Sequence, residues 1–379
     1  MGWQMSEYDE YLRNTWFEID LDQFKKNIDI IKDQVKTRIL VVVKANAYGH
    51  GLEQCALMAE KSGAEMLGVA TVGEVALLRK AGIKCPILRM TAYGLNEMES
   101  FIQEDVHFFV WTKEQIEYAN DLAGKANKRA KVHLKIDTGM GRAGIFAEDV
   151  EQVAQVIQDA EYLDFEGVCS HFHTADMPET DSVFRQIKKF NLAVDTLEKM
   201  NIVPPYIHLS NSPALLRFKE ARYNMVRTGV ITYGQYYERD TDMFDDMKAI
   251  GTWKARLVSV KTLPPDHGIS YSVKYRTTGY EKIGIIPVGY ADGFHRCPLG
   301  INEVLLHGCR VQVVGSVCMD QCMIKIPEDM NAQEGDEVVL MGGQVDDYID
   351  SLDIADKWGT NNYDVFANIS NRVPRLYIN

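Results

Sequence analysis

Over the first two thirds of the chain, short apolar runs rich in β-branched residues alternate with segments of helical periodicity. The first helical segment has its apolar residues three or four positions apart, as one buried helix face requires: Leu21, Phe24, Ile28, Ile31 and Val35. Asp20 and Asp22 lie at its start and can cap it. Residues 148–161 and 183–200 follow the same rule, so we predict helices there as well.

Eight apolar runs have the length and composition of buried strands. They are residues 38–44, 66–70, 86–90, 107–111, 132–137, 165–172, 206–211 and 224–230. Eight β/α units in roughly 230 residues favour a (β/α)8 barrel of the TIM type, whose active site lies at the carboxyl ends of its strands. An open doubly wound sheet is the alternative, but it normally has a glycine-rich phosphate turn after its first strand, where this chain has Lys44. We therefore predict an α/β protein with a barrel over residues 14–247.

After Gly251 the pattern changes to alternating strands interrupted by Gly, Pro and Asp. These strands fall within residues 252–268, 280–293, 303–327 and 335–343. One late helical stretch is expected near residues 347–358. The pattern predicts a β-rich second domain over residues 248–379, with residues 1–13 as a candidate addition to it.

Composition narrows the class of protein. With 379 residues, 46% of them hydrophobic, the chain can bury two cores, while a net charge of -13 without a basic stripe argues against a nucleic-acid partner. Seven cysteines at irregular spacing predict reduced thiols, and Cys318 with Cys322 lacks the companion ligands of a metal site. No apolar run approaches the ~18 residues of a membrane span, so we expect a cytoplasmic protein without membrane contact. The alternative is the cytoplasmic domain of a membrane-anchored protein, because a domain cut from a longer chain has the same composition.

Lys44 is the first candidate for chemistry. It ends the run ILVVVK, so its amine would project into the barrel mouth, where burial can make it a nucleophile toward an aldehyde. The alternative is a surface lysine whose stem covers apolar side chains.

The segment VVKANAYGHG resembles the attachment motif for pyridoxal 5'-phosphate (PLP) in alanine racemases. Eight further segments follow in that family's order: KIDTGMGRAG, SHFHTAD, HLSNSPA, MVRTGVITYG, GISYSVKY, PVGYADG, GSVCMDQ and NRVPR. On these motifs, which cover both predicted domains, the chain is identified as a member of the alanine racemase family. The resemblance implies a barrel with a β-domain, PLP held as a Schiff base by Lys44, a phosphate contact from Tyr48, and racemisation of an amino acid.

The resemblance also assigns residues around the cofactor ring. It implies that Arg142 hydrogen-bonds the phenolic oxygen and the substrate carboxylate, that His171 lies beside the ring, and that Arg227 faces the pyridine nitrogen. A guanidinium does not give up its proton, so it makes a weaker electron sink than an acidic partner would, which suits simple replacement of a Cα proton. Lys135 resembles a lysine that is carbamylated in many members. The alternatives are a satisfied core histidine at His171 and, at Lys135, a core lysine paired with an acid.

A phosphate site is expected at the ends of the last two barrel strands. Ser210, Asn211 and Ser212 open a helix, and Gly229 and Val230 follow the eighth run. Barrels commonly bind phosphate there, and backbone N–H groups at a helix start suit a dianion. A helix cap without a ligand is the alternative, because Ser and Asn are preferred capping residues.

A racemase needs a second acid/base on the opposite face of Cα. The resemblance assigns it to Tyr271, which would reach the active site of the other subunit of a head-to-tail homodimer, where His171 and Arg227 would tune its phenol; an ordinary strand tyrosine is the alternative. By the same resemblance, three further residues lie near the substrate: Met319, Asp320 and Tyr290.

Asn371 departs from the family pattern, in which a tyrosine usually precedes Arg-Val-Pro-Arg. Asparagine opens volume and offers an amide to a hydroxyl, so the pocket is expected to accept serine as well as alanine; neutral drift is the alternative. The departure is similar to the serine racemases of vancomycin-resistance systems, whose racemase domain follows a membrane domain, which would make this chain an excised catalytic portion.

The predicted function is therefore two-base, PLP-dependent interconversion of L- and D-serine, L- and D-alanine, or both. Its product would supply peptidoglycan precursors, with D-serine serving vancomycin resistance. The alternatives are a racemase of alanine alone and a fold-type III PLP decarboxylase, against which Arg227 argues because such enzymes set an acid against the pyridine nitrogen. A PLP carrier protein with the barrel alone would lack the domain that contains Tyr271.

Overall fold

The computed structural model describes residues 13–236, 244–297 and 302–378, which divide into two units. One unit contains Phe24–Ala47 and Leu52–Lys248. The other contains the described parts of Met1–Gln23, Tyr48–Gly51 and Ala249–Asn379. No described helix is both long and apolar enough to cross a membrane.

The first unit is built on eight parallel strands, as the sequence predicts. They are β2 (Arg38–Val42), β3 (Met66–Val69), β4 (Ile87–Arg89), β5 (His107–Val110), β6 (Ala130–Lys135), β7 (Leu163–Cys169), β8 (Tyr206–His208) and β9 (Met225–Thr228). Their order is β8-β7-β6-β5-β4-β3-β2-β9. The Arg227 N–H donates to the Ser210 carbonyl at 3.0 Å and joins β9 to the segment that follows β8. The prediction of a (β/α)8 barrel is confirmed.

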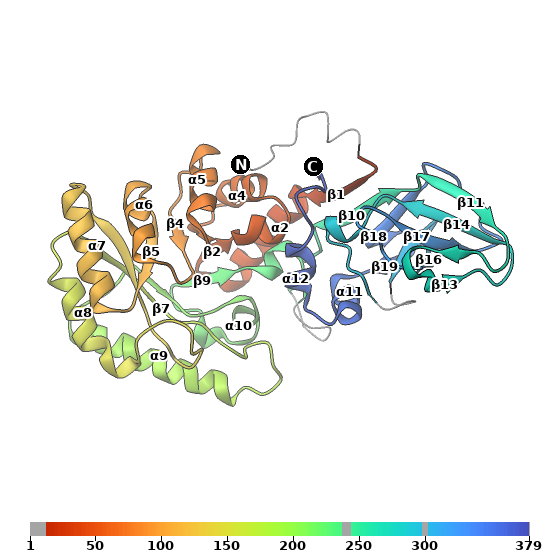
Figure 1. The fold of residues 1–379 in the computed structure, drawn as a ribbon. Coiled ribbons are helices and arrows are strands. Elements are labelled where there is room, and N and C mark those ends of the chain that lie inside the picture. Colours follow the sequence, from red (N-terminus) through yellow and green to blue (C-terminus); the bar gives the residue numbers. More distant parts are fainter. Residues whose placement is uncertain (1–12, 237–243, 298–301, 379) are drawn as a thin grey trace. The chain divides into compact units, whose positions relative to one another are not determined.

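Helices cover the outside of these strands (Figure 1). They are α2 (Leu21–Val35), α4 (Leu52–Lys61), α5 (Val72–Lys80), α6 (Met98–Gln103), α7 (Lys113–Lys125), α8 (Val150–Gln158), α9 (Asp181–Lys199) and α10 (Ser212–Arg217), with 3-10 turns η1 (Leu95–Glu97), η2 (Ala147–Asp149), η3 (Lys219–Ala221) and η4 (Val230–Tyr233). All five apolar positions predicted for the α2 face are buried. Asp20 caps this helix by accepting from the Gln23 N–H at 2.7 Å.

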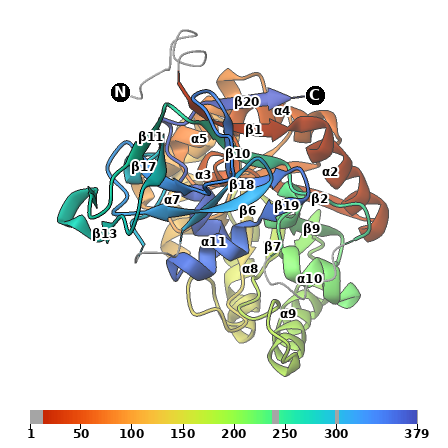
Figure 2. The same cartoon turned by 90° about the vertical axis from the view of Figure 1, so that its right-hand side faces the viewer.

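The second unit is a mainly antiparallel sheet, whose strands β10, β18 and β1 lie side by side in Figure 2. Its strands are β1 (Thr15–Asp20), β10 (Gly251–Arg256), β11 (Ser259–Leu263), β14 (Glu281–Ile286), β15 (Glu303–Leu306), β16 (Cys309–Val314), β17 (Cys322–Ile326), β18 (Glu337–Gln344), β19 (Asp347–Ile349) and β20 (Arg375–Ile378). A separate hairpin pairs β12 (Gly268–Ile269) with β13 (Tyr275–Arg276). Short helical segments complete the unit: α11 (Ser351–Trp358), α12 (Asn362–Ala367), η5 (Tyr271–Val273) and η6 (Tyr290–Asp292).

Three segments differ from the sequence-based boundaries. Strand β1 pairs with β10 and β20, so residues 15–20 lie in this sheet although residues 14–247 were expected to form the barrel. The late helix begins only at Ser351, because residues 347–349 pair with β18. The placement expected for residues 1–13 lies outside the described residues except for Arg13, whose Nη2 is 2.5 Å from Asp292 Oδ1.

Tyr48–Gly51 lies in the second unit because two of its glycines touch that unit's backbone and side chains. Gly49 has φ +82, and an added Cβ would lie 2.2 Å from the Phe366 carbonyl oxygen. Gly51 has φ +101, and its added Cβ would meet the Tyr377 hydroxyl at 1.8 Å. Both positions therefore require glycine, for its backbone conformation and for its lack of a side chain.

Candidate active site

Lys44 lies two residues after the end of β2, so its side chain starts at the carboxyl end of the barrel strands. It is half-buried. Burial lowers the pKa of Lys44 below its usual range, and the nearby Arg142 lowers it further, while Glu74 opposes the shift. A lysine with a lowered pKa holds more neutral amine at neutral pH, which is the form that attacks an aldehyde.

The backbone after Lys44 is a left-handed turn. Ala45, Asn46 and Ala47 have φ of 53°, 56° and 53°, a conformation that costs L-residues roughly 1–2 kcal/mol each. Glu74, in the capping box of α5, holds the turn by accepting from the Ala45 N–H at 2.6 Å. Consecutive strained residues held by neighbouring groups are characteristic of functional sites, which supports a special role for Lys44. Glu74 lies outside the sequence motifs and was not predicted from them.

A cavity at this end of the barrel collects four cations: Lys44, Lys135, Arg142 and Arg227. Apolar side chains, including Met90, Phe109 and Trp111, form other parts of its wall. None of the described lining side chains is acidic. A cavity lined by four basic side chains and by no described acidic one favours an anionic ligand.

Lys135 lies at the end of β6 and is buried, with its Nζ 4.9 Å from the centre of the Phe109 ring. Burial lowers the pKa of Lys135 to about 8, and Arg227 and Arg142 act in the same direction. None of the described acids forms an ion pair with Lys135, and the Arg142 guanidinium bonds to no described residue. The alternative for this position was a core lysine paired with an acid, and the described residues do not form such a pair.

Arg227 is fixed by hydrogen bonds from both terminal nitrogens. Nη1 donates to His208 Nδ1 and to the His208 carbonyl, each at 2.9 Å. Nη2 donates to the carbonyls of Ser170 and Leu209, each at 2.8 Å, and to His171 Nδ1 at 3.2 Å. Because Nδ1 of His171 accepts, a neutral His171 carries its proton on Nε2. Burial, together with Arg227, holds the pKa of His171 well below its usual range, so the ring is neutral.

The loops predicted to bind phosphate are ordered around α10 and η4. The Asn211 side chain accepts from the Ala214 N–H at 3.2 Å. Asn211 therefore caps α10, which is the alternative role that the sequence offers for it. Ser212 Oγ accepts from the Gly229 N–H at 2.9 Å, which leaves the Ser212 hydroxyl proton free to donate.

The Ser210 hydroxyl, in contrast, donates to the Ala221 carbonyl at 2.7 Å and is therefore occupied by the fold. Val230 begins η4 and is buried. The Ser212 hydroxyl and the basic side chains of the cavity wall fit an anionic cofactor such as PLP.

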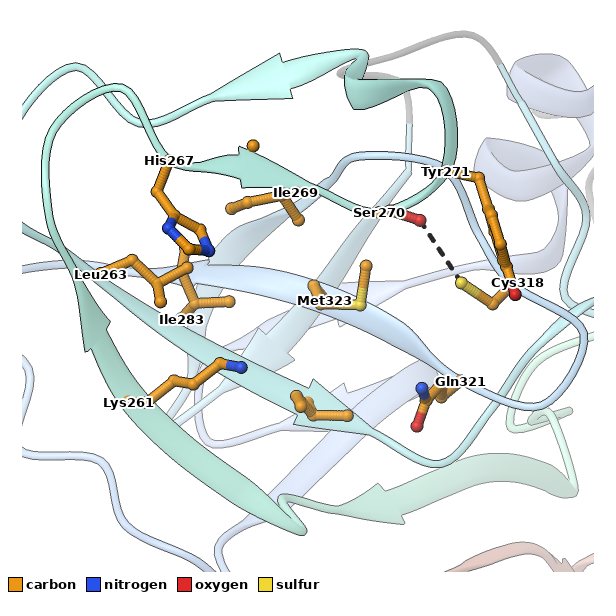
Figure 3. A pocket seen from close by; sticks show the side chains of 12 residues that line it. Lys261, Leu263, His267, Ile269, Ser270, Tyr271, Ile283, Cys318, Gln321 and Met323 are labelled. Carbon is orange, nitrogen blue, oxygen red and sulfur yellow. Dashed lines mark hydrogen bonds between the residues drawn. The ribbon is translucent and has the colours of Figure 1, made fainter.

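In the second unit, Tyr271 lies at the edge of a hollow in the sheet (Figure 3). Tyr271 is 71% exposed. Ser270, Ser272 and Val273 around it have φ of 62°, 62° and 44°, and a positive φ is rare for a β-branched residue such as valine. The alternative was an ordinary strand tyrosine, whereas Tyr271 presents an exposed phenol on a strained loop.

The other predicted substrate residues gather in the second unit. The Tyr290 N–H donates to the Cys318 carbonyl at 3.1 Å, next to Met319, which is 52% exposed. Asp320 accepts from Arg372 Nη2 at 2.6 Å, and Arg372 follows the exposed Asn371 directly.

Tyr48 lies in the same unit, with its ring centre 6.0 Å from that of Tyr363. Burial raises the pKa of Tyr48, so its phenol is neutral.

Comparison with known proteins covers both units. Residues 19–237 match the N-terminal domain of alanine racemase, and residues 250–377 match its C-terminal domain. The chain belongs to the alanine racemase family. The alanine racemase of Halothermothrix orenii is 38% identical over 369 residues, which are 97% of each chain. That of Methanococcus maripaludis is 37% identical over 368 residues, 96% of this chain and 98% of that one.

Solved structures of alanine racemases have the same fold. The enzyme of Clostridium difficile superposes with a TM-score of 0.92 at 36% identity, covering 97% of this chain and 96% of that one. The Bacillus anthracis enzyme, solved with bound L-Ala-P, gives the same values. The alanine racemase family depends on PLP, in agreement with the cationic barrel cavity at Lys44.

Proposed function

We propose that the chain is a PLP-dependent racemase that interconverts the L and D forms of alanine and of serine. The observation that carries this proposal is the position of Lys44, which lies just after a barrel strand at a cavity lined by four basic side chains and by no described acidic one. The product would supply D-amino acids to peptidoglycan precursors, with D-serine serving the vancomycin-resistance route.

When bound, PLP supplies an electron sink that makes the Cα proton of an amino acid removable. Lys44 would hold the cofactor through its amine. Arg227 would face the pyridine nitrogen with Nε–H, the guanidinium donor that has no partner among the described residues. Ser212, through its hydroxyl, and Val230, through its N–H, would donate to the phosphate.

Two bases would then move the proton. Lys44 serves one face of Cα, and Tyr271 of the partner subunit serves the other, in a head-to-tail homodimer with two shared sites. The high exposure of Tyr271 on its strained loop supports this role, because a phenol directed out of its own unit is available to a second subunit.

A fold-type III decarboxylase fits the site less well. Such enzymes set an acidic group against the pyridine nitrogen, whereas the cavity contains Arg227 and none of the described lining side chains is acidic. Carbon dioxide released from an amino-acid substrate would favour the decarboxylase.

Serine specificity is tested at Asn371, because an asparagine there leaves space and an amide for the substrate hydroxyl. Asn371→Tyr should lower kcat/KM for serine about tenfold to a hundredfold, the range expected when one such hydrogen bond is lost. Alanine, which has no hydroxyl, should change by less than about threefold. The measurement is kcat/KM for both amino acids in wild type and variant.

Asn371→Ala is the matched control, because it removes the amide without filling the space. If hydrogen bonding selects serine, this variant also loses serine turnover, and if volume does, only the tyrosine variant loses it. An unchanged serine-to-alanine ratio in both variants would show that Asn371 is drift and that the chain prefers alanine alone.

We further propose that Lys135 is carbamylated. A neutral lysine amine attacks carbon dioxide at carbon, forming the carbamate and releasing one proton. The product is negative and would give Arg142 and Arg227 a counter-charge in a cavity whose described lining includes no acidic side chain.

Because the pKa of Lys135 is lowered to about 8, its neutral fraction is about 10% at pH 7 and about 90% at pH 9. The carbamate should therefore increase with pH at constant dissolved carbon dioxide. Carbon-13 NMR of protein equilibrated with labelled carbon dioxide measures it. A carbamate signal that persists in Lys135→Met, or that is missing from wild type at every pH, contradicts this assignment.

A further inference from the structure

Three histidines inside the barrel form a continuous hydrogen-bonded file behind Arg227. Arg227 Nη1 bonds His208 Nδ1 at 2.9 Å, His208 Nε2 bonds His133 Nδ1 at 3.0 Å, and His133 Nε2 bonds His107 Nδ1 at 3.0 Å. All four residues are at most 3% exposed. The file joins β9 to β8, β6 and β5, and therefore begins at the cationic cavity and continues into the barrel interior.

The guanidinium fixes the direction of every bond in the file. Arg227 can only donate, so Nδ1 of His208 must accept and its Nε2 must carry the proton. The same reasoning applied in turn to His133 and His107 gives each ring a bare Nδ1 and a protonated Nε2. Burial holds the pKa of His107 at about 4 and those of His133 and His208 well below their usual range, so all three rings are neutral.

Gly167 makes the file possible. It is paired with His133 across β6 and β7, and an added Cβ would lie 2.3 Å from His133 Nδ1 and 2.7 Å from Cε1. The His133 ring therefore occupies the space that a side chain at position 167 would fill. From there it passes over β7 and reaches His208. The register of β6 and β7 is irregular at this point, between Val132 and His133, and such irregularities redirect side chains.

The far end of the file lies among charged groups. His107 begins β5, and the charges nearest to it are Lys131, Asp105, Arg79 and Asp164. Lys131 Nζ and Asp105 Oδ2 form an ion pair at 2.8 Å. Burial lowers the pKa of His107 more strongly than these mixed charges alter it, so the ring is neutral and its tautomer follows from the hydrogen bonds of the file.

The file is not a path for protons from the cavity. A proton would have to enter through Arg227, which has no lone pair to accept one. A chain of hydrogen bonds that does not transfer a proton can still orient and polarise the group at its end, which here is the Arg227 guanidinium.

We propose that His208, His133 and His107 are positioning residues for Arg227. His208, fixed by the other two histidines, accepts one hydrogen bond from Nη1 in a defined direction. Three backbone carbonyls and His171 accept the other hydrogen bonds of Nη1 and Nη2. The remaining donor, Nε–H, is thereby aimed at the cavity. The effect on catalysis rests on the proposed function, in which Nε–H faces the pyridine nitrogen, whereas the file itself does not.

The first test is nitrogen-15 NMR of the full-length protein labelled at histidine. Three imidazoles should have bare Nδ1 and protonated Nε2, should not titrate between about pH 5.5 and 8.5, and should share couplings across their N–H···N bonds. A proton on Nδ1 of any of the three, or titration of one within that range, would overturn the proposal.

The second test compares variants at the centre of the file. His133→Leu keeps bulk without polar atoms, whereas His133→Gln supplies an acceptor oxygen for His208 and a donor nitrogen for His107. The leucine variant should lower kcat for alanine racemisation roughly tenfold with KM within about twofold, and glutamine should restore kcat to within about threefold of wild type. Equal kcat in the two variants, high or low, contradicts positioning through hydrogen bonds.

Gly167→Ala tests the same claim without removing a polar atom, and it decides the matter if the leucine variant does not fold. It should shift the His133 and His208 signals and lower kcat as the leucine variant does. Gly279→Ala, at a glycine with no atom within 4 Å of an added Cβ, is the matched control and should change neither. Unshifted histidine signals in Gly167→Ala would contradict the seating of His133. Wild-type protein that has the three tautomers but racemises no amino acid would overturn the proposed function and leave the file intact.

Discussion

Replacing Lys44 with alanine should abolish racemisation and remove the visible absorbance of lysine-bound PLP. The variant loses both the amine that holds the cofactor and one of the two bases, so turnover should fall by at least about 10,000-fold, or roughly 5 kcal/mol in activation free energy. The left-handed turn and the capping box of α5 do not involve the lysine side chain, so the barrel should remain folded. Absorbance spectra and chiral product analysis measure the two effects.

Lys113→Ala is the matched control, because Lys113 is an exposed lysine at the start of α7 in the same unit. It should retain cofactor and activity. If Lys44→Ala still holds PLP covalently after borohydride reduction, another lysine is the attachment site and the assignment of Lys44 is wrong.

Tyr271→Phe should leave PLP bound while lowering turnover in both directions by roughly 1,000-fold. The ring and its packing remain, and only the proton-transferring hydroxyl is lost. Both directions share the loss because each uses both bases at some stage. Tyr280→Phe is the matched control, since Tyr280 is 70% exposed in the same unit and close to Tyr271 in exposure.

Subunit mixing tests whether Tyr271 acts in the partner's site. A heterodimer of Lys44→Ala and Tyr271→Phe chains contains one site with both wild-type residues, so free exchange at equal amounts should restore about a quarter of wild-type activity. Each parent variant alone is inactive. No recovery after exchange has been demonstrated would show that the sites are not shared.

The sequence alone predicts the barrel because eight β-branched runs and amphipathic helices are local patterns. The C-terminal β-rich unit follows from alternating strands in the same way. Residues 15–20 were included in the barrel range and not predicted as a strand, and the partners of β1, β10 and β20, lie far away in sequence. Local periodicity does not show which sheet a segment joins.

Within the site, position at a strand end identified Lys44, and family motifs identified the remaining candidates. The histidine file had no such signal. His107, His133 and His208 lie in three separate strands, where each looks like a single core histidine. Only the pairing of neighbouring strands and the missing side chain of Gly167 bring them together. The role of Glu74 likewise depends on a turn conformation that residue identity does not reveal.

Incubation of the purified protein with PLP and L-alanine in deuterated water, followed by chiral separation and mass analysis, tests the proposed activity most directly. Racemisation predicts D-alanine that accumulates until both enantiomers are equal, with deuterium at Cα in the product. Alanine that stays entirely in the L form, or that is converted to ethylamine and carbon dioxide, would contradict it.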